Sequence, residues 1–538
     1  MSSTFGSFNT VRLGIYAAQK GLDVTGNNIT NINTAGYTRQ RLDQVSLITS
    51  ASDRYYSPYK TRVGQGVLTT GVSQLRDPGL DIAYRNASAD VGAADAKLAG
   101  LEKLASILDE VGKGDGEQDD GVLLNQLNDL RDLINKAITS GLDSTQEGLI
   151  RASAKALCSL FNDAADKLAD MTETWETQLK DQVDTVNNIL TSLRDLNISI
   201  RDADIRGDAA LELRDQRNLL LDQLSQYMDI DVKYEMEDVG AGLMVEKMTV
   251  TLGTGGKDKL VDGGFSAKLL AGSAKDGCPV SLYALRDKNG EKQEPNATDP
   301  KILDDNDLYG ALQSTREMLT EAGEYTIDGT TNDPNAAVKR GIPYYQKALD
   351  SLAHEFAAAM NELNHIYDDK GNLLAGGNLF SMGSATNDAS AITAANISIS
   401  QAWAEDKVSL QASTKPDAPS GDTSNLSKFL ALFDQKIKFD PDHVAGGDAV
   451  GEAYHGTFED MLLHVQSVLA EDQMTTTALL TNYSATASEV YTDREGVMGV
   501  DLNDEATSLM TYQKAYTAAC RLMNVLEEAL DSLINSTV

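Results

Sequence analysis

Residues 26–40 read GNNITNINTAGYTRQ, and a regular hydrophobic pattern ends inside them. Before and within this stretch, apolar or small residues recur at alternating spacings of four and three: Val11, Ile15, Ala18, Leu22, Thr25, Ile29 and Ile32. That spacing predicts a helix whose apolar stripe packs against another helix. The pattern stops at Asn33, and Gly36 and Tyr37 then predict a tight helix exit of fixed direction. On periodicity alone, the plain alternative is an amphipathic helix followed by an ordinary turn.

The other end of the chain carries a second stripe of the same kind. It starts near Leu502 and contains Leu509, Tyr512, Tyr516, Ala519, Met523, Leu526, Leu530 and Leu533. Two such helices predict each other as partners, because neither has a compact core of its own. The first 62 residues hold seven basic and three acidic residues, whereas the chain from Asp493 onward holds three basic and eight acidic ones. Opposite charges favour the pairing, although each charge could also lie on a solvated helix face.

Long helices are predicted between the two ends. Asp77-Pro78 combines an N-cap acid with proline at the first helical position. The sequence STQE at 144–147 predicts a capping box that opens a helix reaching Ile205, about 90 Å long. The register of that helix slips between Trp175 and Val186, which indicates either a stutter or a break. Rods of this length are typical of bundles and fibrous assemblies rather than compact enzymes.

Two turn-rich segments interrupt the helical pattern, and their composition predicts short strands. The sequence therefore predicts a mainly α fold with inserted β structure, in which a long-helix bundle forms a rod, both termini take part, and a mainly β domain lies outside. The expected units are a terminal helical coiled-coil unit at 1–50 plus 492–538, a helical bundle rod at 51–230 plus 342–366 plus 456–491, and an outer variable domain at 231–341 plus 367–455.

Both ends of the chain resemble the flagellar axial proteins, a group of rod, hook and hook-associated proteins. The resemblance rests on GIYAAQKGLDVTGN at 14–27, NNITNINTAGYTRQ at 27–40, GVDLNDEA at 499–506 and YQKAY at 512–516. Ala35 stands where many relatives carry proline. In the middle, VDTVNNIL at 183–190, LN at 196–197, LRDQR at 213–217 and LVDG at 260–263 are similar, in this order, to the FlgK family at the junction of hook and filament. A helical block from Val183 to Arg217 is expected to distinguish that family from hook and rod proteins.

The resemblance implies a structural subunit that joins hook to filament. Its implied partners are copies of itself in a helical or ring assembly, the hook protein, the adjoining junction protein on the filament side and a flagellar export chaperone. It also implies an extracellular location in the flagellum, reached through the flagellar type III secretion apparatus without a cleaved signal peptide. The alternatives are a hook or rod protein, which shares the terminal signatures, and a surface adhesin or glycan-binding protein that acts through the outer domain.

The predicted assembly interface consists of the two stripes and of the turn that leads from the first helix into the rest of the chain. Its residues are Val11, Ile15, Leu22, Ile29, Ile32, Gly36, Tyr37, Leu509, Tyr512, Tyr516, Met523, Leu526, Leu530 and Leu533. The resemblance implies that the terminal helices form an inner tube around the export channel, with the bundle as the next layer and the β insertion outermost. The alternative for each stripe residue is a contact within one subunit.

Composition and charge narrow the function further. The chain has 538 residues and a formal net charge of −35, which excludes a nucleic-acid surface and favours a protein that repels its own copies until specific contacts form. Neither a membrane-spanning apolar run nor a secretory signal peptide is expected. Cys158, Cys278 and Cys520 are too few and too scattered for a disulfide framework or a metal site.

No enzyme site is predicted, and no cofactor or metal is expected. His354 and His365 stand eleven positions apart on one helix, about 16 Å along its axis, which is too far to share a metal ion. The sequence GTGGK at 253–257 lacks the leading glycine of a phosphate loop. The acidic stretch at 305–307 resembles a calcium loop, but Tyr309 and Arg316 occupy ligand positions. Five histidines also leave little capacity for general-base chemistry at neutral pH.

Overall fold

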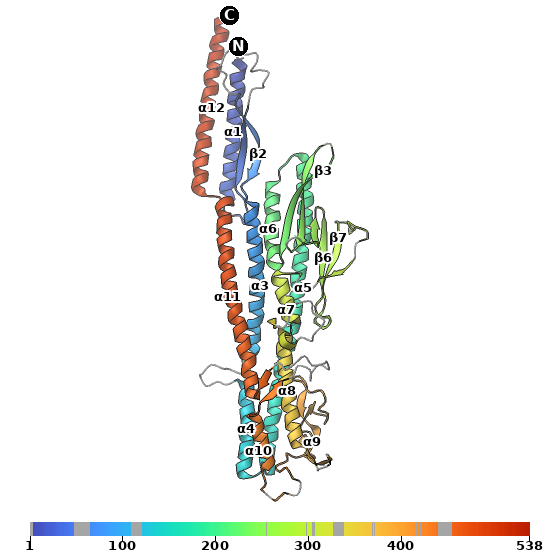
Figure 1. The fold of residues 1–538 in the computed structure, drawn as a ribbon. Coiled ribbons are helices and arrows are strands. Elements are labelled where there is room, and N and C mark those ends of the chain that lie inside the picture. Colours follow the sequence, from blue (N-terminus) through green and yellow to red (C-terminus); the bar gives the residue numbers. More distant parts are fainter. Residues whose placement is uncertain are drawn as a thin grey trace.

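The longest element of the chain is α5, Ser144–Arg206, which runs unbroken for 63 residues, or about 95 Å. The computed structural model describes residues 4–47, 65–108, 121–240, 242–253, 256–296, 299–303, 307–325, 338–367, 370, 372–415, 418–419, 421–439 and 454–537. These residues form an elongated rod, and both chain ends lie at the same tip (Figure 1). The mainly α fold class expected from the sequence is confirmed.

The slip of register in α5 is a stutter and not a break. Buried residues follow one another four apart at Trp175, Leu179 and Val183, and the next buried residue, Val186, comes three positions later. One step of four residues stands where the alternation requires three, so the buried stripe shifts by one residue without interrupting the helix. The helix start also differs from the prediction, because the cap is Asp143 and not Ser144. The Asp143 carboxylate accepts the backbone N–H of Gln146 at 2.7 Å.

Helices of the bundle pack along α5 and along each other. They are α3 (Pro78–Leu108), α4 (Val122–Ser140), α6 (Leu211–Tyr227), α7 (Gly310–Thr320), α8 (Ile342–Asn364) and α11 (Phe458–Met498). The expected helical block from Val183 to Arg217 consists of two helices, because α5 ends at Gly207 with φ 78° and the chain continues as α6. The Arg214 guanidinium bridges this turn to the Asp204 carboxylate at 2.8 Å. Helices α3 and α11 pair along the flank opposite the β-sheet (Figure 1).

Small residues on α3 let two neighbours, α6 and α7, approach it closely. A methyl group added at Gly92 would lie 2.1 Å from the backbone oxygen of Gln226 at the end of α6. At Gly100 it would lie 2.5 Å from the Met318 side chain of α7. Leu101 and Leu104 then fill the space between α3 and the rest of the core, with no exposed surface. The position of α6 on the rod therefore depends on the absence of a side chain at Gly92.

One antiparallel six-stranded sheet lies beside the middle of α5. Its strands follow in chain order: β3 (Ile230–Asp238), β4 (Met244–Leu252), β5 (Lys259–Asp262), β6 (Phe265–Ala271), β7 (Val280–Arg286) and β8 (Lys301–Ile302). Asn187 of α5 holds β6, because its side chain accepts the N–H of Leu269 at 2.8 Å and donates to the Leu269 carbonyl at 2.9 Å. This sheet accounts for the strands that the sequence predicted between 231 and 302.

The described residues within 366–456 do not join that sheet, although one combined outer domain was expected. They form three separate two-stranded sheets, β9–β10 (Ile366–Tyr367, Leu373–Ala375), β11–β12 (Phe380–Met382, Ile397–Ile399) and β13–β14 (Ile437–Phe439, Tyr454–Gly456), with α9 (Gln401–Ala404) and α10 (Ser424–Phe433). Figure 1 shows them at the end of the rod opposite the chain termini. The Asn361 side chain of α8 accepts the N–H groups of Leu379 and Phe380 at the start of β11, and donates to the Phe380 carbonyl, at 2.7–3.0 Å. These hairpins are thus tied to the helical rod itself.

The tip of the rod holds the two terminal helices and a hairpin. Helix α1 (Thr4–Thr30) packs against α12 (Leu502–Thr537), and β1 (Gln40–Ser46) pairs with β2 (Val67–Gln74) beside α1. Figure 1 shows α12 and the hairpin on opposite sides of α1. We call these four elements the terminal unit.

The close approach at Gly92 can be tested with a pair of alanine substitutions. Gly92→Ala should destabilise the rod by about 1–3 kcal/mol, because the new methyl group would overlap the Gln226 backbone. Gly148→Ala in α5, where a methyl group would meet no described atom within 4 Å, should stabilise the chain by about 0.5–1 kcal/mol. Thermal unfolding followed by circular dichroism measures both shifts. A midpoint for Gly92→Ala at or above that of the unsubstituted chain would contradict the packing described here.

The sheet predicts a specific acid sensitivity at Asp262, whose side chain is almost fully buried. Burial opposes its ionisation, but hydrogen bonds from Lys247, Lys259 and Gln293 outweigh that effect and lower the pKa of Asp262 to about 2. A depressed pKa contributes stability that is present above the unfolded value near 4 and is lost as the pH falls towards 2. Asp262→Asn should therefore cost about 2 kcal/mol at pH 7, and the difference should shrink towards zero near pH 2. Urea unfolding at both pH values tests this, and an equal difference at both would contradict it.

Candidate assembly interface

The two terminal helices run antiparallel and meet most closely at Gly21 and Tyr512. A methyl group at Gly21 would lie 2.5 Å from the ring carbons of Tyr512, so the ring occupies the space that a side chain at Gly21 would need. Val11, Ala18 and Thr25 continue the same buried line along α1. The pairing of terminal helices predicted from the sequence is confirmed within one chain. Gly21, which no predicted stripe included, sets the helix spacing.

Burial divides the predicted interface residues into three groups. Val11 is buried. Ile15, Leu22, Ile29, Gly36, Tyr37, Tyr512, Met523, Leu526 and Leu530 are half-buried. Ile32, Leu509, Tyr516 and Leu533 are more exposed, at 37–54%. Their role in an assembly stays a prediction.

A second set of apolar side chains on the terminal unit is exposed. On α12 these are Leu502, Met510, Leu522, Val525 and Ile534, each at least half exposed, and on the hairpin they are Val45 and Leu68. The predicted stripes omitted all seven residues, because each stripe contained a single heptad seam of its helix. Leu522 and Val525 are three positions apart on α12 and form an exposed apolar pair, a surface that another molecule could cover.

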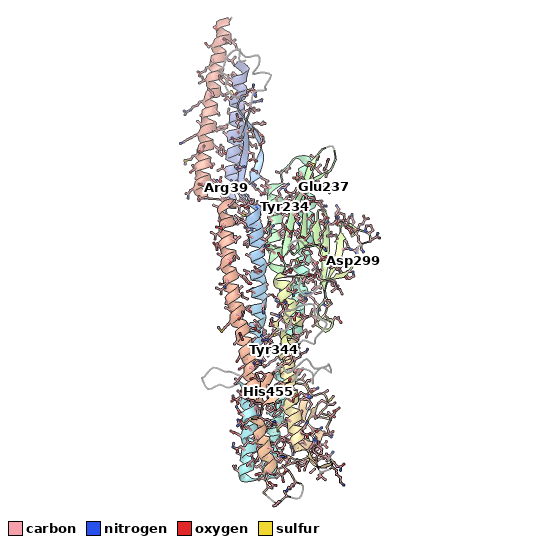
Figure 2. The ribbon with its side chains drawn as sticks, in the orientation of Figure 1. Arg39, Tyr234, Glu237, Asp299, Tyr344 and His455 are labelled. Atoms are coloured by element: carbon pink, nitrogen blue, oxygen red, sulfur yellow. The ribbon has the colours of Figure 1, made fainter. Side chains whose placement is uncertain are left out.

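Arg39 binds the end of α11 and the start of α12 at the same time (Figure 2). Its backbone N–H donates to the Met498 carbonyl at 2.8 Å, and its Nε donates to the buried Glu505 carboxylate at 2.7 Å. Asp504 lies 3.6 Å from the same guanidinium. Residues 499–501 are all that separates α11 from α12. Arg39 therefore spans the bend between the rod and the terminal unit, and we call this place the joint.

Asn28 closes the predicted turn after α1. Its side-chain oxygen accepts the Tyr37 hydroxyl at 2.8 Å and the Gln40 N–H at 3.0 Å, while its amide donates to the Gln40 carbonyl at 2.9 Å. Gly36 adopts φ 75°, as expected, and a methyl group there would lie 3.2 Å from Leu219 of α6. Burial, followed by the charges of three nearby carboxylates, raises the pKa of Tyr37, so its hydroxyl remains a donor.

Asp215 connects the turn to α6. Its carboxylate accepts the Thr38 N–H at 3.1 Å and the Gln74 side-chain amide at 2.8 Å, and the Arg76 guanidinium lies 4.0 Å away. Burial raises the pKa of Asp215 despite these donors. Thr38 and Arg39 belong to the N-terminal sequence signature, Asp215 to the string LRDQR and Glu505 to the C-terminal signature. Three motifs that are remote in sequence therefore meet at the joint.

Arg494 at the end of α11 completes the joint. It donates to the Asp222 carboxylate of α6 at 2.7 Å and lies 3.7 Å from Asp81 of α3. Its guanidinium also stacks over the Tyr84 ring at 3.9 Å from the centroid. Arg85 of α3 binds the same Asp222 at 3.0 Å. Buried ion pairs add little net stability, but breaking one leaves a buried charge, so they are effective at specifying one arrangement.

The sequence reasoning missed Gly21, Asn28 and Arg39 as joint and spacing residues. A hydrophobic pattern cannot report polar or absent side chains, so periodicity carried no signal for them. Arg39 and Asn28 do stand inside the signature at 27–40, which was the available hint. The basic residues Arg54, Lys60 and Arg62, which supported the charge argument, lie outside the described residues.

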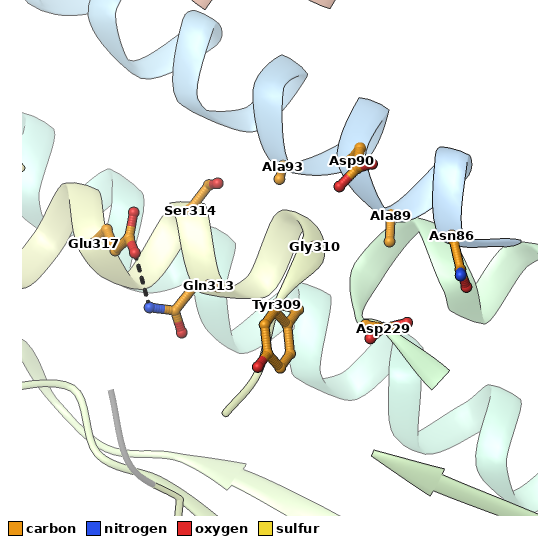
Figure 3. Close-up of a pocket in the computed structure, with 10 residues that line it drawn as sticks. All are labelled: Asn86, Ala89, Asp90, Ala93, Asp229, Tyr309, Gly310, Gln313, Ser314 and Glu317. Carbon is orange, nitrogen blue, oxygen red and sulfur yellow. Dashed lines mark hydrogen bonds between the residues drawn. The ribbon is translucent and has the colours of Figure 1, made fainter. Parts of the chain in front are cut away.

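The rod shows no arrangement for chemistry in its described part. A pocket of about 540 Å³ lies between α3 and α7, with Asp90, Asp229, Gln313 and Glu317 around it (Figure 3). Gln313 donates to Glu317 at 2.9 Å, and burial together with the charge of Asp229 raises the pKa of Asp90. Within the described residues, no group of three or more histidine, cysteine or acidic side chains could hold a metal ion. Most of the stretch at 305–307 lies outside those residues.

The cysteines and helices also agree with a structural role. Cys158 and Cys278 are buried, and burial raises the pKa of Cys158 to about 12 and that of Cys278 to about 11. Both thiols are therefore protonated and shielded at neutral pH. None of the helices in the described part of the chain has the length and apolar composition needed to span a bilayer.

Comparisons with known proteins agree with the motifs at the joint. Residues 116–380 match the family described as the flagellar hook-associated protein FlgK helical domain. The chain is 26% identical to flagellar hook-associated protein 1 of Bacillus subtilis, over 99% of both chains. It is 22% identical to the protein of that name from Salmonella typhimurium, over 98% of this chain and 99% of that one.

One solved structure with similarity is that of the flagellar hook junction protein FlgK from Burkholderia pseudomallei. The superposed region covers 56% of this chain and 47% of that one. Its TM-score is 0.41 at 20% identity. The sequence similarity is the stronger finding, because it extends over the whole length and includes the terminal signatures and the helical middle that meet at the joint. Residues 116–380 belong to the FlgK helical-domain family, and the whole chain is similar to flagellar hook-associated proteins.

Proposed function

We propose that this chain is a structural, non-enzymatic subunit of the bacterial flagellum that joins hook to filament through its terminal unit. The proposal rests on one observation: helix α12 carries apolar residues on more than one side. Tyr512 and Met523 face α1 within the chain, whereas Leu522 and Val525 face outward and stay uncovered. A helix with apolar residues on two sides is buried on both only when a second molecule covers the outer side.

The partners that suit this surface are other copies of the chain in a ring or helical assembly. The hook protein on one side and the adjoining junction protein on the other are the further partners, in keeping with the names of the relatives. A location outside the cell, export through the flagellar type III secretion apparatus and binding to an export chaperone belong to the same proposal, and the similarity to hook-associated proteins supports them. Full-length similarity to hook-associated proteins favours this role over that of a hook or rod protein.

The net charge of the chain limits which contacts between copies can form. The net charge of −35 makes copies repel one another, so only a contact with complementary faces can hold them together. Screening by salt shortens the range of this repulsion to about 10 Å at 0.1 M ionic strength. The apolar outer face of α12 supplies an attraction that salt does not weaken.

The joint sets the direction in which the terminal unit presents these faces. Arg39 ties α11 to α12 across the three-residue bend, and Asp215 and Asn28 tie the turn after α1 to the bundle. A subunit in a symmetric assembly must present its contacts at one angle in every copy. We therefore assign Arg39 as the residue that fixes the angle of the terminal unit on the rod.

The outer face of α12 can be tested with Leu522→Asp, which adds a carboxylate to a side chain that is half exposed in the single chain. The folded monomer should melt close to the unsubstituted chain, because Leu522 is half exposed and the core of the rod lies elsewhere. Assembly should fail, since burying an unpaired carboxylate costs several kcal/mol. Filament formation and swimming in cells that carry the variant measure the loss. Asn524→Asp adds the same charge on the polar side of the same turn and should leave motility intact, whereas normal filaments with Leu522→Asp would refute the proposal.

The role of Arg39 can be separated from general surface charge. Arg39→Ala leaves the buried Glu505 carboxylate without its partner, so the first turns of α12 should open more easily by about 1–3 kcal/mol. Hydrogen exchange at residues 502–512 should accelerate about tenfold or more, while α5 should keep its protection. Arg41→Ala, two residues along the same strand, removes a guanidinium that pairs with Asp43 at an exposed position and should change the exchange less than twofold. Equal protection in both variants would remove Arg39 from this role.

A further inference from the structure

The pocket between α3 and α7 is a groove lined by one face of each helix (Figure 3). Each helix contributes four residues at positions i, i+3, i+4 and i+7, which lie on one side of a helix. The volume of about 540 Å³ lies within the range of about 300–1,000 Å³ that small-molecule sites occupy. We call this pocket the acidic groove, and its lining consists of Asn86, Ala89, Asp90 and Ala93 of α3, Gly310, Gln313, Ser314 and Glu317 of α7, and the neighbouring Asp229 and Tyr309.

The groove has carboxylates at both of its ends. Gly310 packs against the backbone at 227–228, so the start of α7 lies next to Asp229. Asp90 lies at the same end, and burial together with the charge of Asp229 raises its pKa, so these two carboxylates repel each other. Glu317 lies at the opposite end, seven residues beyond Gly310 on α7, or about 10 Å along the helix axis.

Ser314 gives an independent indication of a ligand. The residue is only 7% exposed and lines the groove, and its hydroxyl has no hydrogen-bond partner among the described residues. Thr315, the next residue, donates its own hydroxyl to the Ala311 carbonyl at 2.9 Å, as hydroxyls inside helices commonly do. A hydroxyl that is buried without a partner is unfavourable, so a bound molecule that supplies one is expected at Ser314.

The oxygen atoms that line the groove call for a ligand that donates hydrogen bonds. Glu317 accepts Gln313 and Lys339 through one oxygen, Oε1, at 2.9 and 2.6 Å, which leaves Oε2 for another donor. The side-chain oxygen of Gln313 already accepts Arg316 at 3.0 Å. An ammonium group has three donors and no acceptor, so it matches carboxylate and hydroxyl oxygens. A metal ion fits less well, because no group of three or more ligating side chains gathers in the described part of the chain.

Short apolar side chains lie between the two acidic ends. In Figure 3, Ala93 lies between Asp90 and Glu317, and Ala89 is buried on the same face of α3. Methyl groups at these positions suit a chain of methylene groups, which would leave water there. A single ammonium group cannot contact both ends, since they lie about 10 Å apart. Two ammonium groups that are joined by a methylene chain can do so.

We propose that the acidic groove binds a linear polyamine, with one terminal ammonium group between Asp90 and Asp229 and the other at Glu317. Ser314 accepts a hydrogen bond from an inner amino group. The Tyr309 ring, which lines the first end, adds an aromatic face that attracts cations. The inference goes beyond the proposed function and does not depend on it, because the groove lies on the rod and the proposed assembly surface lies on the terminal unit.

Titration calorimetry of the whole chain with spermidine, a linear triamine, measures this binding. At about 0.15 M salt, unspecific attraction to the acidic surface is screened beyond about 8 Å. One spermidine should bind per chain. Butylamine carries a single ammonium group and should bind at least about ten times more weakly, because it cannot reach both ends of the groove at once.

Three variants locate the binding site. Ser314→Ala changes no charge and should weaken binding about fivefold, because one hydrogen bond to the ligand is lost. Asp90→Asn should weaken it about tenfold, since it removes a charged acceptor. Asp95→Asn removes an exposed carboxylate of the same helix that does not line the groove, and it should change binding less than about twofold. Melting curves by circular dichroism confirm that each variant is folded.

Several results would overturn the inference. Binding of more than one spermidine per chain, with equal affinity in Ser314→Ala and Asp95→Asn, would indicate attraction to the acidic surface as a whole. Equal binding of butylamine and spermidine, a comparison that needs no variant, would show that one ammonium group is sufficient. Absence of spermidine binding would also overturn it. None of these results bears on the joining of hook to filament, which the Leu522→Asp variant tests separately.

Discussion

The ion pair between Arg39 and Glu505 is the interaction on which the arrangement of the whole chain depends. Two long helices, α11 and α12, meet there across three residues, and such a short connection has no packing of its own to fix a direction. Arg39 supplies both an amide for the last carbonyl of α11 and a guanidinium for a buried carboxylate of α12. Because Glu505 is out of water, any other direction of α12 would leave its charge unpaired. Electrostatics selects the angle, and hydrophobic packing then stabilises it.

The rod on the other side of the joint depends on close approach instead of charge. Gly92 lets the end of α6 lie directly against α3, and α5 carries one unbroken buried stripe past the sheet and the far hairpins. Two asparagines, Asn361 buried and Asn187 half-buried, supply hydrogen bonds that apolar residues could not. Asn187 and Asn361 each bind the backbone of a strand edge, so the β structure is held on the helices by hydrogen bonds. The result is a stiff rod from which a terminal unit projects at a defined angle.

The terminal unit differs from the rod because only part of its apolar surface is covered within the chain. Helix α1 is covered on two sides, by α12 and by the hairpin, and those two partners turn further apolar residues outward. For a chain with a net charge of −35, such surfaces carry little risk of unspecific association, since copies approach one another only where the charges match. The contact between α1 and α12 suits a subunit that folds alone. The exposed apolar residues suit a subunit whose surface is covered by neighbouring copies.

The amino-acid pattern by itself determined which segments are helical, because a spacing of three and four places apolar residues on one side of a helix whatever surrounds it. The stripes on α1, α5 and α12 and the pairing of the two ends follow from that rule, and the motifs at 27–40 and 499–506 pointed to the family. The side of each helix that faces inward was decided by the tertiary structure. Ile32, Leu509, Tyr516 and Leu533 lie on predicted stripes yet are exposed, while Gly21 and Asn28 are buried. Periodicity counts only apolar side chains, whereas the spacing of α1 and α12 depends on a missing side chain and the joint depends on polar ones. The separation of residues 366–456 from the six-stranded sheet also needed the tertiary structure, since a strand pattern does not say which partner it will join.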